Sequence, residues 1–584
     1  MRRIIPGFCV ALFLVLLWAS FLDAAEAAIP ARVPDKGSVA VERDRRAGRI
    51  TARDATLYRA YELFSPDKLP ERYRCDTSLK SRTCVTPQLR NLLHDWDNLP
   101  EAGRLVVPAY LRPGASRGRK AVPKGSLTPS IAMDVAGSAK TDGGDPDDTP
   151  SYDRTYATTN FLIHYSSSGD NRLIQSADGN HNGIPDMVEY AGQYFEATWT
   201  WMIDNGYDLP PGTDTDYYNV YFEDLSIYGA LGYTAPIDYS RESRSFIVLT
   251  TDWSGFELPT GTPIAPADEL RVTCSHEFFH AVQFGYDSYE DSWWMEACSV
   301  WIEDNVGAAW DGVNDYLWWV GYYLYWPEVG LDADYWSSHW YMTCLWPIYL
   351  HSHVDADGSI IREIWEDCVG APNAMDATKS VLAGHLPGGF DEAWLDFLVA
   401  NYERDYPEAA AFPIAYSNLY FTDVNYSYPA SGPRYDEYSP EGLGSNYVRF
   451  YPAGGSAPDL SVSFTGQFST ATWRGMLVGK KTASYDRQDF LSSSGGVLLN
   501  FAVNYTQAAL IVTPAIDGYT NGELFFYDYS AALLASDSTA PSPNPMTWSS
   551  QPHQVSTSSI AMTATTATDI ANPPVSYYFD ETSG

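Results

Sequence analysis

The chain has 584 residues, of which 45% are hydrophobic and 19% are charged. This length predicts several domains, and this composition excludes a chain that is disordered throughout. The 37 Lys and Arg against 74 Asp and Glu give a net charge of −37, which excludes a general nucleic-acid binder because phosphate contacts need a basic surface. Residues 1–125 are an exception to this acidic character, since they hold 22 basic and 13 acidic side chains. The rest of the chain holds 15 basic and 61 acidic side chains.

The first 27 residues predict a secretory signal peptide. Arg2 and Arg3 precede an apolar stretch from Phe8 to Leu22, and Ala25-Glu26-Ala27 follows as a cleavage site of small residues. The apolar stretch has about 15 residues where a spanning helix needs roughly 20, although an N-terminal membrane anchor is the alternative. No later segment is long and apolar enough to span a membrane. We therefore expect a secreted, extracellular protein.

Residues 28–125 form a basic N-terminal region, with helices expected at Asp54–Phe64 and near Pro87–Trp96. The region ends in Arg117-Gly118-Arg119-Lys120, a cluster suited to trypsin-like cleavage, and a polar linker follows over residues 126–152. Because the net charge of the region is opposite to that of the body, we expect a pro-segment that docks over the active site until it is cut. A permanent N-terminal subdomain is the alternative.

The cysteine count is compatible with disulfides. Cys9 leaves with the signal peptide, and six cysteines remain in an oxidising compartment. Cys75 and Cys84 are close in sequence, so we expect them to pair. Cys344 and Cys368 lie symmetrically about the expected turn Val354–Gly358, which predicts a second pair. Elimination then leaves Cys274–Cys298 as the third pair. Buried free thiols are the alternative for each pair.

Residues 153–410 predict an α+β domain of mixed strands and helices. Strands are expected at Phe161–Tyr165, Asn219–Phe222 and Phe246–Thr250, a helix over residues 191–205, and several Trp-rich helices after Pro266. One segment fits a calcium loop position by position, with oxygen ligands at 1, 3, 5, 9 and 12, a carbonyl at 7 and Gly at 6. The expected calcium ligands are Asp178, Asn180, Asn182, Ile184, Asp186 and Glu189. An Asn/Gly-rich turn without metal is the alternative.

Residues 411–533 predict a β-sandwich, because short apolar runs alternate with Gly, Ser and Asn turns. The runs are Tyr447–Tyr451, Leu460–Phe464, Gly475–Gly479, Val497–Val503, Ala508–Thr513 and Glu523–Tyr529. A Ser/Pro-rich linker covers residues 534–547. Residues 548–584, with alternating patterns at Ser559–Thr565 and Val575–Phe579, resemble the opening strands of a fibronectin type III-like module. They are too few to complete one, so we expect a fragment.

The central motif is His276-Glu277-Phe278-Phe279-His280. Residues four apart lie on one face of a helix, so both imidazoles can reach one zinc ion while Glu277 stands beside a metal-bound water. Asp268 is expected to cap this helix and Gly285 to follow its end. A second helix opens with Ser292-Trp293-Trp294-Met295-Glu296, and a helical hairpin of this length can return Glu296 as the third ligand. Three protein ligands leave a position open, as in catalytic zinc sites.

These residues resemble the gluzincin class of zinc metallopeptidases, which includes thermolysin. They are more similar to a set of secreted bacterial proteins that are themselves predicted metalloproteases, over roughly residues 155–405. The resemblance implies a zincin-like fold, His276, His280 and Glu296 as zinc ligands, and Glu277 as general base. Thermolysin-like enzymes place an Asp four residues after the ligand Glu, where this chain has Val300. Glu303, two turns after Glu296, is the candidate substitute as a partner of a ligand histidine.

The resemblance also implies an oxyanion donor on a helix downstream of Glu296. Tyr341 is the first candidate and His339 the second, with core packing as the alternative for Tyr341. The expected function is a secreted zinc metalloendopeptidase, stabilised by calcium, that hydrolyses protein or peptide substrates. The alternatives are an adhesin or glycan-binding protein on a zincin scaffold, and a zinc amidase that acts on cell-wall cross-links.

Overall fold

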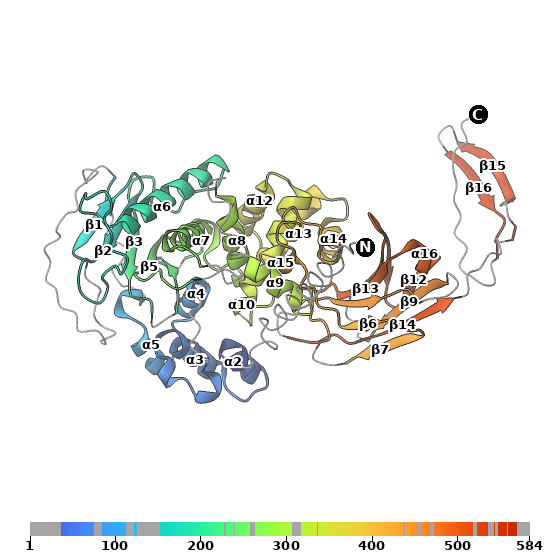
Figure 1. Ribbon diagram of the computed structural model, residues 1–584, viewed down its shortest axis with the longest axis horizontal. Coiled ribbons are helices and arrows are strands. Elements are labelled where there is room, and N and C mark those ends of the chain that lie inside the picture. The colour runs from blue at the N-terminus through green and yellow to red at the C-terminus, as the bar shows by residue number, and fades with distance from the viewer. Residues whose placement is uncertain are drawn as a thin grey trace, which may run out of the picture. The chain divides into compact units, whose positions relative to one another are not determined.

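The computed structural model describes residues 37–74, 84–112, 122–124, 152–226, 229–238, 240–256, 263–306, 317–335, 337–435, 438–453, 458–467, 472–517, 522–534, 542–543, 547–556 and 559–568. The chain divides into two compact units, the first with Met1–Tyr420, Pro440–Ser445 and Thr513–Phe525, the second with the remainder. The first is a mixed α+β unit and the second is largely β, which confirms the predicted fold class (Figure 1). The signal peptide, Cys75, Arg117–Lys120, most of the 126–152 linker and Val575–Phe579 lie outside the described residues.

The N-terminal segment is helical, and its two predicted helices are confirmed to within about two residues. Thr51 and Asp54 form a capping box, in which the Thr51 hydroxyl accepts from the Asp54 N–H at 3.1 Å. The helices are α2 (Gly37–Arg46), α3 (Ala52–Phe64), α4 (Thr86–His94) and α5 (Glu101–Val106), with 3-10 turns η1 (Pro66–Lys68), η2 (Glu71–Tyr73) and η3 (Ala109–Leu111).

A five-stranded sheet forms the scaffold of the first unit, in the order β1-β2-β3-β5-β4. The central strands β2, β3 and β5 are parallel, and the edge strands β1 and β4 are antiparallel to their neighbours. Their bounds are β1 (Arg154–Ala157), β2 (Phe161–Tyr165), β3 (Tyr218–Glu223), β4 (Gly232–Pro236) and β5 (Ser245–Thr250). The sequence predicts β2, β3 and β5, and the structure adds both edge strands.

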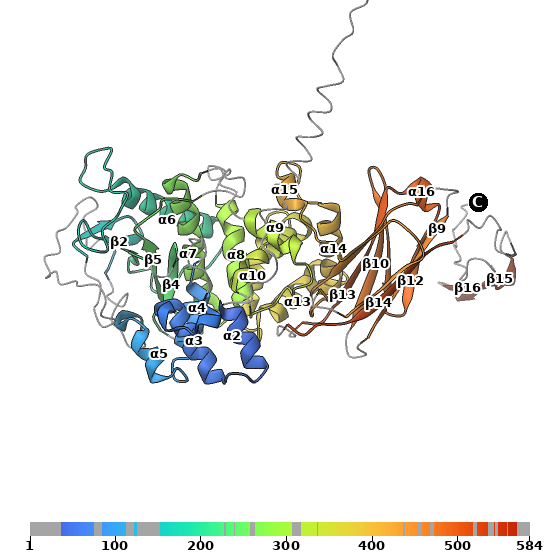
Figure 2. The same cartoon turned by 60° about the horizontal axis from the view of Figure 1, so that its bottom comes forward.

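Both faces of this sheet are covered, because alternate side chains of a strand point to opposite faces. On one face, Phe161 contacts Phe195 of α6 (Asp186–Asp204) and Phe278 of α7 (Pro266–Asp287). On the other, Tyr221 of β3 and Val248 of β5 belong to one buried cluster with apolar side chains of the N-terminal segment. Those side chains are Leu89, Leu92, Leu93, Val106, Val107 and Leu111. Figures 1 and 2 show the N-terminal helices in blue on this side of the sheet.

Helix α7 is longer than its motif predicts. It starts at Pro266, an N-terminal position that suits proline, and it continues through Gly285 to Asp287. Asp268 therefore lies in the first turn rather than at the cap, and Gly285 lies inside the helix. A Cβ at Gly285 would lie 3.4 Å from Pro211 Cδ, an ordinary van der Waals contact, so packing alone does not require glycine there.

The remaining helices of the first unit follow α7, and α8 begins at Ser292 as predicted. They are α8 (Ser292–Asn305), α9 (Leu317–Tyr325), α10 (Ser337–Met342), α11 (Leu345–Tyr349), a π-helical turn η4 (Leu350–Val354), α12 (Ser359–Cys368), α13 (Ala374–His385), α14 (Gly389–Glu403) and α15 (Pro413–Tyr416). No helix among the described residues is both long enough and apolar enough to cross a membrane.

The predicted disulfides are wrong for the cysteines that the structure describes, which are all free and buried. They are Cys84, Cys274, Cys298, Cys344 and Cys368. Burial raises the pKa of Cys344 and Cys368 well above the ordinary value, and different carboxylates add to the rise, Glu303 and Glu290 respectively. The thiols expected to pair thus face different surroundings.

The second unit contains two sheets that pack through Phe464, whose ring contacts Trp473 and Phe490 of the other sheet. One sheet has the order β11 (Tyr485–Leu491), β10 (Trp473–Lys480), β13 (Gln507–Pro514), β8 (Asn446–Phe450), β6 (Asp423–Asn425). The other has β12 (Ser494–Leu498), β9 (Asp459–Gly466), β14 (Tyr527–Leu534), β7 (Ala430–Arg434). A hairpin of β15 (Trp548–Ser556) and β16 (Ser559–Ala564) follows.

Most of the predicted strands of this unit are confirmed, and two are shifted. The run Val497–Val503 is only half strand, because Asn500 has φ 52° and starts the helical turn α16 (Phe501–Asn504). The run Glu523–Tyr529 enters its strand only at Tyr527.

The buried carboxyl of Glu290, in the connection between α7 and α8, should make stability depend on pH. Burial, followed by the charge of Asp291, raises the pKa of Glu290 from 4.5 to about 7. A carboxyl whose pKa is raised on folding stabilises the fold below its unfolded pKa and loses that contribution as pH rises through the folded pKa. Between pH 4.5 and 7 we expect a loss on the order of 3 kcal/mol.

Glu290→Gln should flatten this dependence, because the amide oxygen can still accept from the Ala374 N–H. Urea unfolding at several pH values measures it, with the exposed Glu242→Gln as control. Parallel pH curves for Glu290→Gln and the unchanged protein would contradict the assignment.

Candidate metal centre

Helix α7 brings the two predicted histidines together. His276 and His280 are one turn apart, and their Nε2 atoms lie 3.2 Å from each other. His276 is 5% exposed and His280 is fully buried. The i, i+4 spacing therefore aims both ring nitrogens at one point, as the sequence predicts.

Helix α8 returns antiparallel to α7 and adds Glu296. Its Oε2 lies 3.1 Å from His276 Nε2 and 3.7 Å from His280 Nε2. The carboxylate is fully buried. The helical hairpin thus places Glu296 where the sequence expects the third ligand.

A fourth side chain enters the same point from the N-terminal segment. Cys84 Sγ lies 3.3 Å from His276 Nε2, 3.4 Å from His280 Nε2 and 3.2 Å from Glu296 Oε1. One ligand atom from each of the four residues lies within 4.8 Å of the others. Sequence reasoning missed Cys84, which it assigned to a disulfide; the one available signal was an additional cysteine in a segment expected to cover the site.

Acceptors hold the outer nitrogens of both histidines. His276 donates from Nδ1 to Glu303 Oε1 at 2.7 Å, which confirms the expected position of Glu303. His280 donates from Nδ1 to Gln283 Oε1 at 2.7 Å. Gln283 is itself fixed, since its amide donates to the Met295 carbonyl at 3.0 Å. Each Nδ1 therefore faces an acceptor outside the cluster, and each Nε2 faces the other ligand atoms. Gln283, three residues after His280, was findable from helical spacing.

The donor set fits a divalent metal ion. Two imidazole lone pairs, a carboxylate and a sulfur converge in a buried volume, and such a group of acceptors repels itself unless a cation lies among them. Burial would lower the pKa of His280, but the Cys84 sulfur and Glu296 raise it to about 10. Burial would raise the pKa of Glu296, but the histidines hold it at about 2. The raised pKa of His280 and the lowered pKa of Glu296 both indicate that the site favours positive charge at the point where these side chains meet.

Glu277 lies beside the cluster and faces the edge strand β4. Its Oε2 accepts from the hydroxyls of Thr234 at 2.8 Å and Thr86 at 3.1 Å. Its Oε1 is buried and accepts no hydrogen bond from the described residues. Burial raises the pKa of Glu277, and the charges of the nearby histidines partly oppose this rise. A Cβ at Gly232 would lie 3.0 Å from Glu277 Oε1, so glycine on β4 allows this close approach.

The two candidate oxyanion donors occupy different places. The Tyr341 ring is parallel to the His276 ring with centroids 6.0 Å apart, and its hydroxyl donates to the Cys84 carbonyl at 2.9 Å. His339 Nε2 lies 2.9 Å from the Gly330 carbonyl, and the His339 ring stacks on Tyr323. Burial lowers the pKa of His339 to about 4, so it is neutral near pH 7. Tyr341 is therefore the better placed of the two.

The predicted calcium loop precedes α6, and hydrogen bonds link its side chains. Glu189 accepts from the amides of Asn180 at 2.9 Å and Asn182 at 2.8 Å. Asp178 accepts from the N–H groups of Asn182 and Gly183. Gly183, at position 6, has φ 88°, a conformation that favours glycine. The loop thus has the sharp turn that its sequence predicts.

The cavity at the cluster is small. Its volume is about 20 Å³, and it is lined by Cys84, Leu231, Glu269, Val272, Thr273, His276, Glu277 and Glu303. A water molecule needs roughly 10–15 Å³, so one water fits and a peptide does not.

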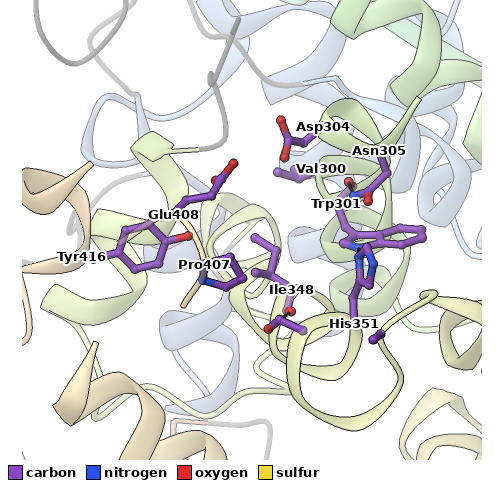
Figure 3. A pocket seen from close by; sticks show the side chains of 11 residues that line it. Val300, Trp301, Asp304, Asn305, Ile348, His351, Pro407, Glu408 and Tyr416 are labelled. Atoms are coloured by element: carbon purple, nitrogen blue, oxygen red, sulfur yellow. Dashed lines mark hydrogen bonds between the residues drawn. The ribbon is translucent and has the colours of Figure 1, made fainter. Parts of the chain in front are cut away.

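A separate cavity of about 330 Å³ lies between the end of α8, the π-helical turn and the residues around α15. Figure 3 shows Trp301 and His351 side by side on one wall and Pro407, Glu408 and Tyr416 on another. Trp301 Nε1 donates to His351 Nδ1 at 3.3 Å. None of the predicted site residues lines it.

Known proteins add little to this assignment. No family model matches the chain, and no curated protein matches it. Among solved structures, the Yersinia pseudotuberculosis-derived mitogen matches with 8% identity and a TM-score of 0.15, over 20% of this chain and 93% of that chain. A likeness this weak carries no argument about fold or function. The case for the site therefore rests on its own residues.

Removal of the Glu303 carboxylate should weaken metal binding. Without it, the His276 ring loses the acceptor that fixes its orientation, and such a loss typically lowers metal affinity by about 10–100-fold. Competition with a chelator measures this for Glu303→Ala. Glu303→Gln keeps an acceptor oxygen and should lose less. Asp304→Ala, which removes the next carboxylate of the same helix, should bind metal normally. Equal affinity of Glu303→Ala and the unchanged protein would contradict this role.

Proposed function

We propose that the protein is a secreted zinc-dependent metalloendopeptidase. The observation that carries the proposal is the buried convergence of His276, His280 and Glu296 beside the carboxylate of Glu277. Each of these side chains lies where the two-helix motif requires it, and each outer histidine nitrogen is already held by an acceptor. The signal-like N-terminus, which lies outside the described residues, supports export.

Zinc is the metal that best suits this donor set. Imidazole, carboxylate and thiolate are all zinc ligands, and three protein ligands with an exchangeable fourth position characterise its catalytic sites. His276, His280 and Glu296 would hold the ion. When bound, zinc supplies Lewis acidity that activates water and polarises a carbonyl group.

Glu277 and Tyr341 supply the remaining chemistry. Glu277 Oε1, which accepts no hydrogen bond from the described residues, is free to take the proton of an attacking water and pass it to the leaving amine. The raised pKa of Glu277 suits a group that must both accept and release a proton near neutral pH. Tyr341 already donates to a backbone carbonyl beside the cluster, which supports its proposed role as the donor that stabilises an oxyanion.

An extended peptide is the substrate class that the surroundings favour. Strand β4 is a sheet edge, and Glu277 lies against it. An extended chain can add to such an edge through main-chain hydrogen bonds. This favours a peptidase over an amidase acting on cell-wall cross-links, and the presence of Glu277 favours an enzyme over an adhesin.

Two further parts of the proposal come from the sequence. Residues 28–125 act as a pro-segment, cut at the basic cluster Arg117–Lys120, and the 178–189 loop binds a structural calcium ion. The ligands of that ion would be Asp178, Asn180, Asn182, the Ile184 carbonyl, Asp186 and Glu189.

Glu277→Gln should abolish most of the activity but keep the metal. General-base catalysis contributes about 10²–10⁴-fold, so we expect kcat to fall by at least about a hundredfold. Cleavage of a protein substrate library by the processed enzyme, with metal content measured in parallel, tests this. Inhibition by chelators serves as the control for metal dependence. Near-normal turnover in the variant would disprove the role of Glu277.

Asp178→Ala or Glu189→Ala should lower Tm in calcium and change it little in chelator, because a ligand bound only to the folded state stabilises that state. Thermal unfolding in both conditions measures the difference. Asp170→Ala, on the surface before the loop, is a matched control. Equal destabilisation with and without calcium would mean that the loop binds none.

A further inference from the structure

We propose that Cys84 is a removable fourth zinc ligand, and that residues Cys84–Arg90 keep the peptidase inactive by occupying its site. This inference rests on the proposed function, since it requires zinc at His276, His280 and Glu296. It assigns Cys84 a role different from a disulfide.

Cys84 would raise the number of protein ligands of the metal from three to four. Cys84 Sγ lies between 3.2 and 3.4 Å from a ligand atom of each of the other three residues. Zinc sites with four protein ligands are closed and structural, whereas catalytic sites keep one position for water. The same site is therefore closed with Cys84 and open without it.

The segment also engages the residues around the metal position. The Cys84 carbonyl accepts from Tyr341, the proposed oxyanion donor, at 2.9 Å. The Thr86 hydroxyl donates to Glu277 Oε2 at 3.1 Å and accepts from the Thr234 N–H of strand β4 at 2.7 Å. Two residues thus occupy the metal position, the oxyanion donor, the general base and the sheet edge at once.

The space left at the cluster is too small for a substrate. With the segment in place, the cavity at the cluster measures about 20 Å³. That volume holds one water molecule, and a substrate cannot enter until the segment leaves.

Helix α4 anchors the inhibitory residues. Arg90 is 2% exposed, and it donates to the Glu290 carbonyl and, at 2.9 Å, to Ser292 Oγ. Burial lowers the pKa of Arg90 to about 10, so it remains charged at neutral pH. Asn91 also donates to Ser292 Oγ, at 3.1 Å. These contacts fix α4 to the start of α8, the helix that carries Glu296.

The exchange at the metal is a ligand substitution without oxidation or reduction. When zinc binds, the Cys84 S–H bond breaks, its proton passes to solvent, and sulfur supplies the electron pair of the Zn–S bond. On activation that bond breaks, water takes the position, and the thiolate regains a proton.

Cobalt in place of zinc tests the ligand directly. In the full chain, Co²⁺ should give the near-ultraviolet charge-transfer band of a thiolate–cobalt bond. The band should be lost in Cys84→Ala, which should still bind cobalt through the other ligands. It should persist in Cys368→Ala, which removes a buried thiol outside the cluster. Absence of the band in the unchanged protein, or its persistence in Cys84→Ala, would overturn the assignment.

A second measurement needs no variant. Iodoacetamide converts a free thiol to a thioether with loss of iodide, and peptide mass analysis locates the label. Cys84 of the native zinc-loaded chain should react slowly, and chelator should accelerate its reaction while the chain stays folded. Equal rates with and without chelator would contradict zinc ligation.

Activity separates the inference from the proposed function. Full-length Cys84→Ala should cleave protein substrates about tenfold faster or more than the unchanged chain, which corresponds to a closed state favoured by at least about 1.4 kcal/mol. Equal activity in the two chains would refute inhibition by Cys84 and leave the peptidase standing. If Cys84→Ala loses the cobalt band but neither chain cleaves protein substrates, the proposed function would be refuted and Cys84 would remain a metal ligand. A full chain that binds no metal would refute both.

Discussion

The structure of the first unit depends on four electron-pair donors that meet in a buried volume. His276, His280, Glu296 and Cys84 are each at most 5% exposed, and burying such polar groups costs free energy unless they are paired or hold a cation. The rest of the fold must therefore offset the free energy needed to bring these four side chains together. It does so through the antiparallel packing of α7 and α8, through the acceptors Glu303 and Gln283, and through the aromatic layer in which Phe278 joins α7 to the sheet.

The N-terminal segment docks through apolar packing as well as through charge, since the charges of Arg46, Arg59 and Arg45 oppose the rise in the pKa of Asp334 that burial causes. Leu89, Leu92 and neighbouring apolar side chains lie in one buried cluster with Tyr233 and Val248 of the sheet. Burial of apolar surface is worth roughly 25 cal/mol per Å², whereas attraction between exposed charges is screened within about 10 Å at 0.1 M salt. Arg90, a buried cation in this contact, acts through hydrogen bonds to Glu290 and Ser292.

Local periodicity predicted much of the candidate site, and long-range contacts accounted for what it missed. Helical spacing alone relates His276 to His280 and Glu296 to Glu303, and a short hairpin relates the two pairs. Cys84 precedes His276 by 192 residues, and no local pattern distinguishes a cysteine that reaches a metal from one in a disulfide. Strand β4 was missed because Gly232 and Pro236 disfavour a strand by propensity, although both are accommodated at an edge. In the second unit, the strand stops before the left-handed Asn500, although the apolar pattern continues beyond it.

The contact between Thr86 and strand β4 has a consequence for solubility. An uncovered sheet edge presents unpaired N–H and C=O groups that can pair with the same edge of another molecule. Here the outward Thr234 N–H is satisfied by Thr86, and α4 contacts β4. While the N-terminal segment is in place, this edge is shielded. If the segment is released as proposed, the edge would be open to an extended substrate and equally to a second copy of the protein, so release would exchange protection from self-association for access to the site.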